Sequence, residues 1–127
     1  MNEEIADPSH PRYQSLLMRN RISEASLKGM LADSAMIAHG RGEAFDYLLG
    51  EQTIPSALDA TREVAARLLK AKKPVLSLNG NAIALAGREF LTIASQLGCP
   101  IEINLFYRTP QRMGALLAHL KLLNANL

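Results

Sequence analysis

The stretch PVLSLNGNAIAL, Pro74–Leu85, decides the fold class of this chain. Its first residues, Pro74–Leu78, form a short apolar run that ends in Asn79-Gly80-Asn81, which is the pattern of a strand followed by a tight turn. A helical pattern continues over about residues 83–97, and we expect a break near Gly87. The stretch therefore predicts a strand that leads almost directly into a helix.

The same order is repeated once toward the end of the chain. Gly98 is a candidate helix C-cap, and IEINLF, Ile101–Phe106, predicts a second strand. Thr109 then caps a helix that opens with Pro110 and runs to about Leu122. Strand, helix, strand and helix in this order favour a parallel βαβ unit, whose strands end at one common edge of the sheet.

The residues upstream of this unit predict three helices. After a loose polar lead-in over residues 1–10, helical patterns cover about 11–30, 43–49 and 54–70. We therefore expect one α/β domain over residues 1–127, with a helical part at 11–72 and a strand–helix part at 73–127. Two strands are too few for an independently stable sheet, so we expect the sheet to be incomplete in this chain, either because the chain is a portion of a longer protein or because a partner completes the sheet.

Composition excludes several classes of function. The chain has 127 residues, 48% hydrophobic and 20% charged, with a net charge of +2 and scattered basic residues, so we expect no nucleic-acid partner. A single cysteine, Cys99, allows no internal disulfide. The first residues lack the pattern of a signal peptide, and no apolar run is long enough to cross a membrane. We expect a cytoplasmic protein with no membrane partner.

No metal site is expected from the side chains alone. The three histidines, His10, His39 and His119, have no neighbours at the spacing of metal ligands.

The stretch IAHGRGEAFDYLLG is richer in chemistry, because Gly40 and Gly42 flank Arg41 in a predicted loop before a helix. Glycines allow the backbone to approach a ligand closely, and an arginine can form bidentate hydrogen bonds with a phosphate or a carboxylate. The alternative is a glycine-bent loop whose carboxylates, Glu43 and Asp46, only favour a helix start.

Polar residues also follow both predicted strands. Asn79 and Asn81 can orient a ligand's carbonyl or hydroxyl groups, or they can simply form a strand–helix turn. Asn104 and Arg108 follow the second strand, and Arg108 lies just before a helix N-terminus, which is a favourable place for an anion. Arg19 lies on the first predicted helix, where its spacing is that of an ordinary solvated arginine. If the residues after the two strands meet at one rim, they favour an anionic, phosphorylated substrate.

Four stretches carry a resemblance to a known family. SHPRYQSLLMRNRI, IAHGRGEAFDYLLGEQT, PVLSLNGNAIAL and IEINLFYRT, in this order and at these spacings, resemble archaeal phosphopantothenate synthetase, also called 4-phosphopantoate–β-alanine ligase. The resemblance covers essentially the whole chain. It implies a homodimer with a Rossmann-like nucleotide fold that works in coenzyme A biosynthesis.

The resemblance also implies a reaction and roles for particular residues. ATP would activate the carboxylate of 4-phosphopantoate as an acyl-adenylate with loss of pyrophosphate, and the amine of β-alanine would then attack to give 4'-phosphopantothenate and AMP. Arg19 and Arg41, with the backbone of Gly40 and Gly42, are expected to hold ATP, with Mg2+ neutralising its phosphates. The remaining roles are our inference from the residues: Asn79, Asn81 and Arg108 are expected to bind substrate, Asn104 is expected to act in catalysis on the reacting carboxylate, and His39 is expected to act in catalysis by contacting phosphate or moving a proton.

Family members are much longer than this chain, and their second half carries further strands and nucleotide contacts. We therefore expect this chain to be inactive as a ligase by itself. An alternative from another class is a non-catalytic phosphate- or nucleotide-binding module, or a dimerisation module, that keeps the fold without the chemistry.

Overall fold

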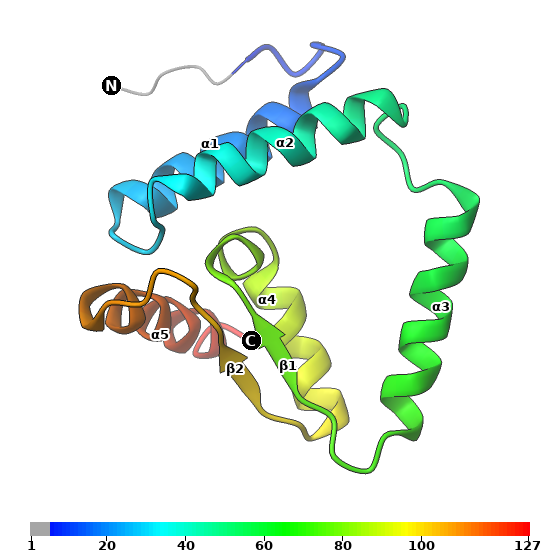
Figure 1. Ribbon diagram of the computed structural model, residues 1–127, viewed down its shortest axis with the longest axis vertical. Helices are drawn as coiled ribbons and strands as arrows, with labels where there is room; N and C mark the ends of the chain where they lie inside the picture. The colour runs from blue at the N-terminus through cyan, green and yellow to red at the C-terminus, as the bar shows by residue number, and fades with distance from the viewer. Residues whose placement is uncertain (1–5) are drawn as a thin grey trace.

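The computed structural model describes residues 6–127 as five helices and a small parallel sheet of two strands (Figure 1). Within these residues the elements are α1 (Tyr13–Leu27), α2 (Ser34–Leu48), α3 (Pro55–Lys70), β1 (Leu76–Leu78), α4 (Gly80–Leu97), β2 (Ile101–Ile103) and α5 (Pro110–Asn124). The predicted order, three helices followed by strand, helix, strand and helix, is confirmed. Part of the predicted lead-in, residues 1–5, lies outside the described residues, and His10 closes a turn by donating to the Asp7 carbonyl at 2.8 Å.

The two strands pair in parallel but are shorter than the apolar runs that predict them. Leu76 lies opposite Ile101 and Leu78 opposite Ile103. The pairing ends where the backbone N–H of Asn104 donates to the Leu78 carbonyl at 2.8 Å, because the residue after Leu78 already caps α4. Residues 104–106, predicted as strand, therefore leave the sheet and form part of the β2–α5 connection.

Helix α4 begins as soon as β1 ends. The side chain of Asn79 accepts a hydrogen bond from the N–H of Ala82 at 2.8 Å, so the helix starts at Gly80, three residues earlier than the pattern predicts. The break expected near Gly87 is confirmed, because Ala86 has non-helical dihedrals (φ −138°, ψ 24°). Gly98 ends the helix in the left-handed conformation predicted for a C-cap.

The predicted loop around Arg41 is wrong. Gly40, Arg41 and Gly42 lie inside α2, which begins at Ser34 and passes through both glycines without interruption. A glycine inside a helix costs only about 1 kcal/mol relative to alanine, and α2 offsets that cost by packing the side chains of Ala35 and Met36 against the core. Glu43 and Asp46 consequently lie in the second half of the helix, and they do not set its start.

The core lies where α4 meets α1, α5 and the sheet. Ile22 of α1, Ile83 of α4 and Leu116 of α5 are fully buried, and Leu76 and Leu78 extend this cluster from β1. Gly87 allows α4 to approach α5 closely, since a Cβ there would lie 3.0 Å from Leu123 Cδ1. Helix α4 is thus the element around which the described chain packs.

Helix α3 stands apart from the other elements (Figure 1). None of its residues is buried, and of its predicted apolar stripe only Leu68 packs against the core. Leu58, Val64 and Leu69 are exposed, because nothing in the described chain lies against them. Across residues 6–127, no helix is long and apolar enough to cross a membrane.

Candidate functional site

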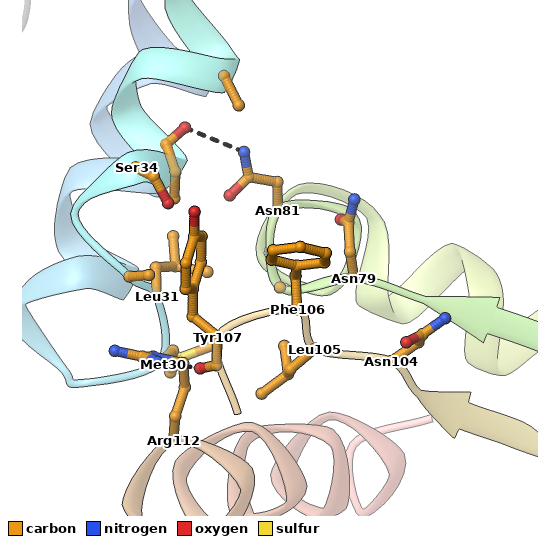
Figure 2. A pocket seen from close by; sticks show the side chains of 14 residues that line it. Met30, Leu31, Ser34, Asn79, Asn81, Asn104, Leu105, Phe106, Tyr107 and Arg112 are labelled. Atoms are coloured by element: carbon orange, nitrogen blue, oxygen red, sulfur yellow. Dashed lines mark hydrogen bonds between the residues drawn. The ribbon is translucent and has the colours of Figure 1, made fainter. Parts of the chain in front are cut away.

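A pocket of about 210 Å³ lies at the edge of the sheet where both strands end (Figure 2). We call it the rim pocket. Its wall comes from the α1–α2 turn and the first turn of α2, from the first turn of α4, and from the β2–α5 connection with one residue of α5. The lining residues are Met30, Leu31, Ala32, Ser34, Ala35, Ala38, Asn79, Gly80, Asn81, Asn104, Leu105, Phe106, Tyr107 and Arg112.

Hydrogen bonds and close packing fix the α4 side of the rim pocket. Asn81 donates from its side chain to the Ala35 carbonyl of α2 at 3.1 Å, so the first turns of the two helices are held together (Figure 2). At Gly80 a Cβ would lie 2.6 Å from Leu31 Cδ2, so any side chain there would have to displace Leu31. The N–H groups at a helix start lack partners within the helix and carry partial positive charge. Two such starts line this pocket, which favours an anionic ligand.

The β2–α5 connection gives the rim pocket an arginine, but a different one from the prediction. Arg108 is exposed and is not among the lining residues, whereas Arg112, in the first turn of α5, is. Arg112 donates to the Tyr107 carbonyl, and its backbone N–H is capped by the Thr109 side chain at 3.1 Å. Among the described residues, its buried Nε has no hydrogen-bond partner. The predicted Thr109 cap is the signal that could have pointed to Arg112, three residues later in the same turn.

Two aromatic rings stand at the end of this connection. Phe106 and Tyr107 make an edge-to-face contact with ring centroids 5.2 Å apart, and Phe106 is 93% exposed. Asn104, next to them, donates to the Ser77 hydroxyl across the strand ends at 3.3 Å. The pocket therefore combines amide groups, one guanidinium and an aromatic pair, a mixture suited to a ligand with both polar and apolar parts.

A second depression, of about 450 Å³, lies between α1 and the second half of α2. We call it the interhelix hollow. It shares no lining residue with the rim pocket, and it is lined by Arg12, Arg19, Gly40, Glu43, Ala44, Tyr47 and Leu48. The structure therefore brings Arg19 and Gly40 together, and it separates them from the asparagines of the rim.

Charged groups converge on Glu43 in this hollow. Its Oε1 accepts a hydrogen bond from Arg19 Nη1 at 2.8 Å and lies 3.4 Å from His39 Nε2, while Oε2 accepts from the Ser15 hydroxyl at 3.3 Å. Burial alone would raise the pKa of the Glu43 carboxyl, but the Arg19 hydrogen bond and the charges of His39 and Arg19 hold that pKa below its usual range. Glu43 is therefore an ionised carboxylate at neutral pH.

The remaining predicted residues have different environments. The His39 side chain is only 10% exposed and lines neither depression, because it packs against Glu43. Arg41 and Gly42 are exposed on α2 and line neither depression. A Cβ at Gly40 or Gly42 would meet nothing within 4 Å, so packing inside the described chain does not explain either glycine.

Metal chemistry has no ready set of side-chain ligands in the described residues. Within residues 6–127, no group of three or more histidine, cysteine or acidic side chains is placed to hold a metal ion. Cys99 is a partly buried free thiol next to the core cluster, in agreement with the absence of an internal disulfide.

The fold and the rim pocket define an α/β protein that gathers polar groups at the carboxyl edge of a parallel sheet, where such proteins bind ligands. A family model described as phosphopantothenate/pantothenate synthetase matches residues 56–126, which is more than half of the chain. The chain belongs to the phosphopantothenate/pantothenate synthetase family. The resemblance recognised in the sequence is thereby confirmed.

Curated relatives give the same family. The chain is 52% identical over 113 residues to the 4-phosphopantoate–β-alanine ligase of Thermococcus onnurineus, an alignment that covers 89% of this chain and 43% of the relative. Identity is 50% to the enzyme of the same name from Thermococcus kodakarensis, again with 89% and 43% covered. It is 47% to that from Methanospirillum hungatei, with 89% and 46% covered. The chain thus spans less than half the length of these relatives.

Proposed function

We propose that this chain supplies substrate- and nucleotide-binding residues of an ATP-dependent ligase that joins 4-phosphopantoate and β-alanine. The products are 4'-phosphopantothenate, AMP and pyrophosphate, and the reaction belongs to coenzyme A biosynthesis. The name of the relatives supports the reaction. The observation that carries the site assignment is the meeting of two helix starts, three asparagines and Arg112 in one pocket at the carboxyl edge of the sheet.

The proposed chemistry has two steps. A carboxylate oxygen of phosphopantoate attacks the α-phosphorus of ATP, the bond to the β-phosphate oxygen breaks, and pyrophosphate leaves with its electron pair. The amine of β-alanine then attacks the acyl carbon of the adenylate, loses a proton, and expels AMP. Both steps bring anions together, so the protein has to supply positive charge and hydrogen-bond donors where negative charge gathers.

In this proposal the rim pocket takes phosphopantoate. Asn79 and Asn81 lie on the first turn of α4, and the partial positive charge at the starts of α2 and α4 favours the phosphate or the carboxylate of the substrate. Arg112 adds a full positive charge. Arg108, the arginine predicted for this role, is exposed outside the pocket, so the proposal assigns substrate binding to Arg112 in its place.

The interhelix hollow is the proposed site for the phosphates of ATP. Arg19 lines it with a side chain that is 50% exposed, and the missing side chain of Gly40 leaves the α2 backbone open to close approach. Arg41 and Gly42 continue the same helix, and they are proposed to complete the nucleotide contacts from its exposed surface. Mg2+ is proposed to arrive on the phosphates of ATP, and no step is assigned to it.

The proposal keeps Asn104 as a residue that contacts the reacting carboxylate, since it lines the rim pocket at the end of β2. His39 is buried against Glu43 and does not line either depression, so its role in the proposal is to act through that carboxylate. The whole protein is proposed to act in the cytoplasm as a homodimer.

The test is an AMP-release assay with ATP, phosphopantoate and β-alanine, run beside calorimetric titrations of each substrate. We expect ATP binding that Arg19→Ala and Arg41→Ala weaken, and phosphopantoate binding that Arg112→Ala weakens while Arg108→Ala does not. ATP binding with no AMP formation, in the chain joined to the remainder of its protein, would favour the non-catalytic nucleotide-binding module. If neither substrate binds in that full protein, the proposed function is wrong.

A further inference from the structure

Glu43 lies within 4 Å of three basic side chains, those of Arg12, Arg19 and His39. Its carboxylate receives hydrogen bonds from Arg19 at 2.8 Å and Ser15 at 3.3 Å, and it lies 3.7 Å from Arg12 Nη2 and 3.4 Å from His39 Nε2. The side chain is only 13% exposed. These partners come from both α1 and α2, which lie side by side (Figure 1), so one carboxylate joins the two helices that form the hollow.

The hydrogen bond to Glu43 fixes Arg19 without covering it. Arg19 Nη1 donates to Glu43, and half of the arginine side chain stays exposed on the hollow. A guanidinium has five N–H donors, so most of them remain directed away from the carboxylate. A long side chain that is already held in one conformation loses less freedom when a phosphate binds to it.

A carboxylate in a phosphate site also has an opposing effect. Its negative charge repels the phosphate and partly neutralises the arginines. At this site Arg12 and Arg19 together outnumber the charge of Glu43, although Arg12 also pairs with Glu51 at 2.7 Å. The carboxylate is therefore useful to an anion site only if the positioning of Arg19 outweighs the repulsion.

We propose that Glu43 is a positioning residue of the nucleotide site, and that it holds Arg19 in the conformation that receives the phosphates of ATP. This inference rests on the proposed function, because it takes Arg19 as a contact of ATP. It predicts that removing the negative charge weakens ATP binding, which is the opposite of the effect expected from simple repulsion. It also predicts that Glu43 matters only while Arg19 is present.

A double-mutant cycle measures both predictions by calorimetric titration of ATP. We expect Glu43→Gln to weaken ATP binding about tenfold, and Arg19→Ala to weaken it at least as much. The double variant should bind ATP no more weakly than Arg19→Ala alone. The matched control is Glu63→Gln, which breaks another 2.8 Å carboxylate–arginine contact, that of Glu63 with Arg67 on exposed α3, and should leave ATP affinity unchanged.

The outcomes separate this inference from the proposed function. If the unaltered full protein does not bind ATP, the proposed nucleotide site is wrong, and the proposed function fails when phosphopantoate does not bind either. If it binds ATP and Glu43→Gln binds equally well or more tightly, Glu43 does not position Arg19. Effects of the two single variants that multiply in the double variant would also overturn the inference, because they would act independently.

Circular dichroism and thermal unfolding check that each variant is folded at the titration temperature. Where Glu43→Gln is not folded, Glu43→Asp takes its place. It keeps the charge but shortens the side chain, so weaker ATP binding that disappears in the Arg19→Ala background supports the inference, and unchanged binding contradicts it.

Discussion

The side chain of Asn81 on α4 donates a hydrogen bond to the backbone carbonyl of Ala35 on α2, at 3.1 Å, across 46 positions of sequence. This contact joins the first turns of two helices, and both residues line the rim pocket (Figure 2). Asn81 thus bonds to α2 and also lines the rim pocket.

Asn81→Asp tests this contact with almost no change of shape. The amide donor becomes an acceptor that faces the Ala35 carbonyl, and a negative charge enters a pocket proposed for an anion. We expect a loss of stability of about 1–3 kcal/mol and a loss of phosphopantoate binding, measured by urea unfolding and calorimetry. Asn124→Asp, at the exposed end of α5, is the control: it should leave phosphopantoate binding unchanged and cost only about 0.3–1 kcal/mol, because a negative charge is disfavoured at a helix C-terminus. Unchanged binding by Asn81→Asp would show that Asn81 does not face the anion.

Gly80→Ala tests the close approach of α4 to the α1–α2 turn. The added Cβ would lie 2.6 Å from Leu31 Cδ2, so the buried Leu31 side chain would have to shift from its place at the rim pocket. We expect a loss of about 1–3 kcal/mol in the free energy of unfolding. Gly114→Ala is the matched control: its Cβ would meet nothing within 4 Å inside α5, and it should stabilise the protein by about 0.5–1 kcal/mol. Equal effects of the two substitutions would contradict the packing argument.

Gly40→Ala and Gly42→Ala are expected to change stability and ATP binding in opposite directions. Both glycines lie inside α2, where an alanine is favoured and a Cβ meets open space, so each substitution should raise stability by about 0.5–1 kcal/mol. If ATP approaches the α2 backbone at these positions, the same methyl groups should weaken ATP binding. Thermal unfolding and calorimetry give the two quantities. More stable variants that bind ATP as tightly as before would remove these glycines from the nucleotide site.

His119 is expected to make the fold sensitive to mild acid. Burial of its ring, and to a lesser extent the charge of Lys28, lower the pKa of His119 below its ordinary value of 6.5. On acidification the unfolded chain therefore takes up a proton before the folded chain does. Stability from this group is complete above about pH 6.5 and declines as the pH falls toward the lower pKa of the folded state.

The check is urea unfolding between about pH 7.5 and about pH 5. His119→Gln should reduce the loss of stability over this range, and Lys28→Met should reduce it by a smaller amount because it removes only one of the two causes. A pH dependence of His119→Gln identical to that of the unaltered chain would assign the acid sensitivity to other groups.

The sequence predicted best those elements whose ends carry specific local chemistry. Thr109 and Pro110 mark the start of α5, Gly98 marks the end of α4, and the structure has both. The α2 helix was missed over its first half because glycines near Arg41 normally indicate a loop. Packing of Ala35 and Met36 against the core decides that segment, and such packing depends on residues far away in the chain.

The candidate site was predicted in part for a similar reason. Asn79, Asn81 and Asn104 follow strands that pair in parallel, so topology alone brings them to one pocket. Which arginine joins them depends on the path of the β2–α5 connection, and this path turns Arg112 inward and leaves Arg108 exposed. The spacing of residues along the sequence does not predict that path.

The close approach at Gly80 has a consequence for how the rim pocket can change. Because α4 meets the Leu31 side chain of the α1–α2 turn at a residue without a side chain, a side chain at position 80 would displace Leu31 and reshape the cleft that Leu31 lines. The side chains of Asn79, Asn81 and Arg112 line the same cleft, so substitutions there would change both its chemical groups and its shape. Gly80 differs from these residues because a change there would act on the cleft through the packing of α4 against the α1–α2 turn.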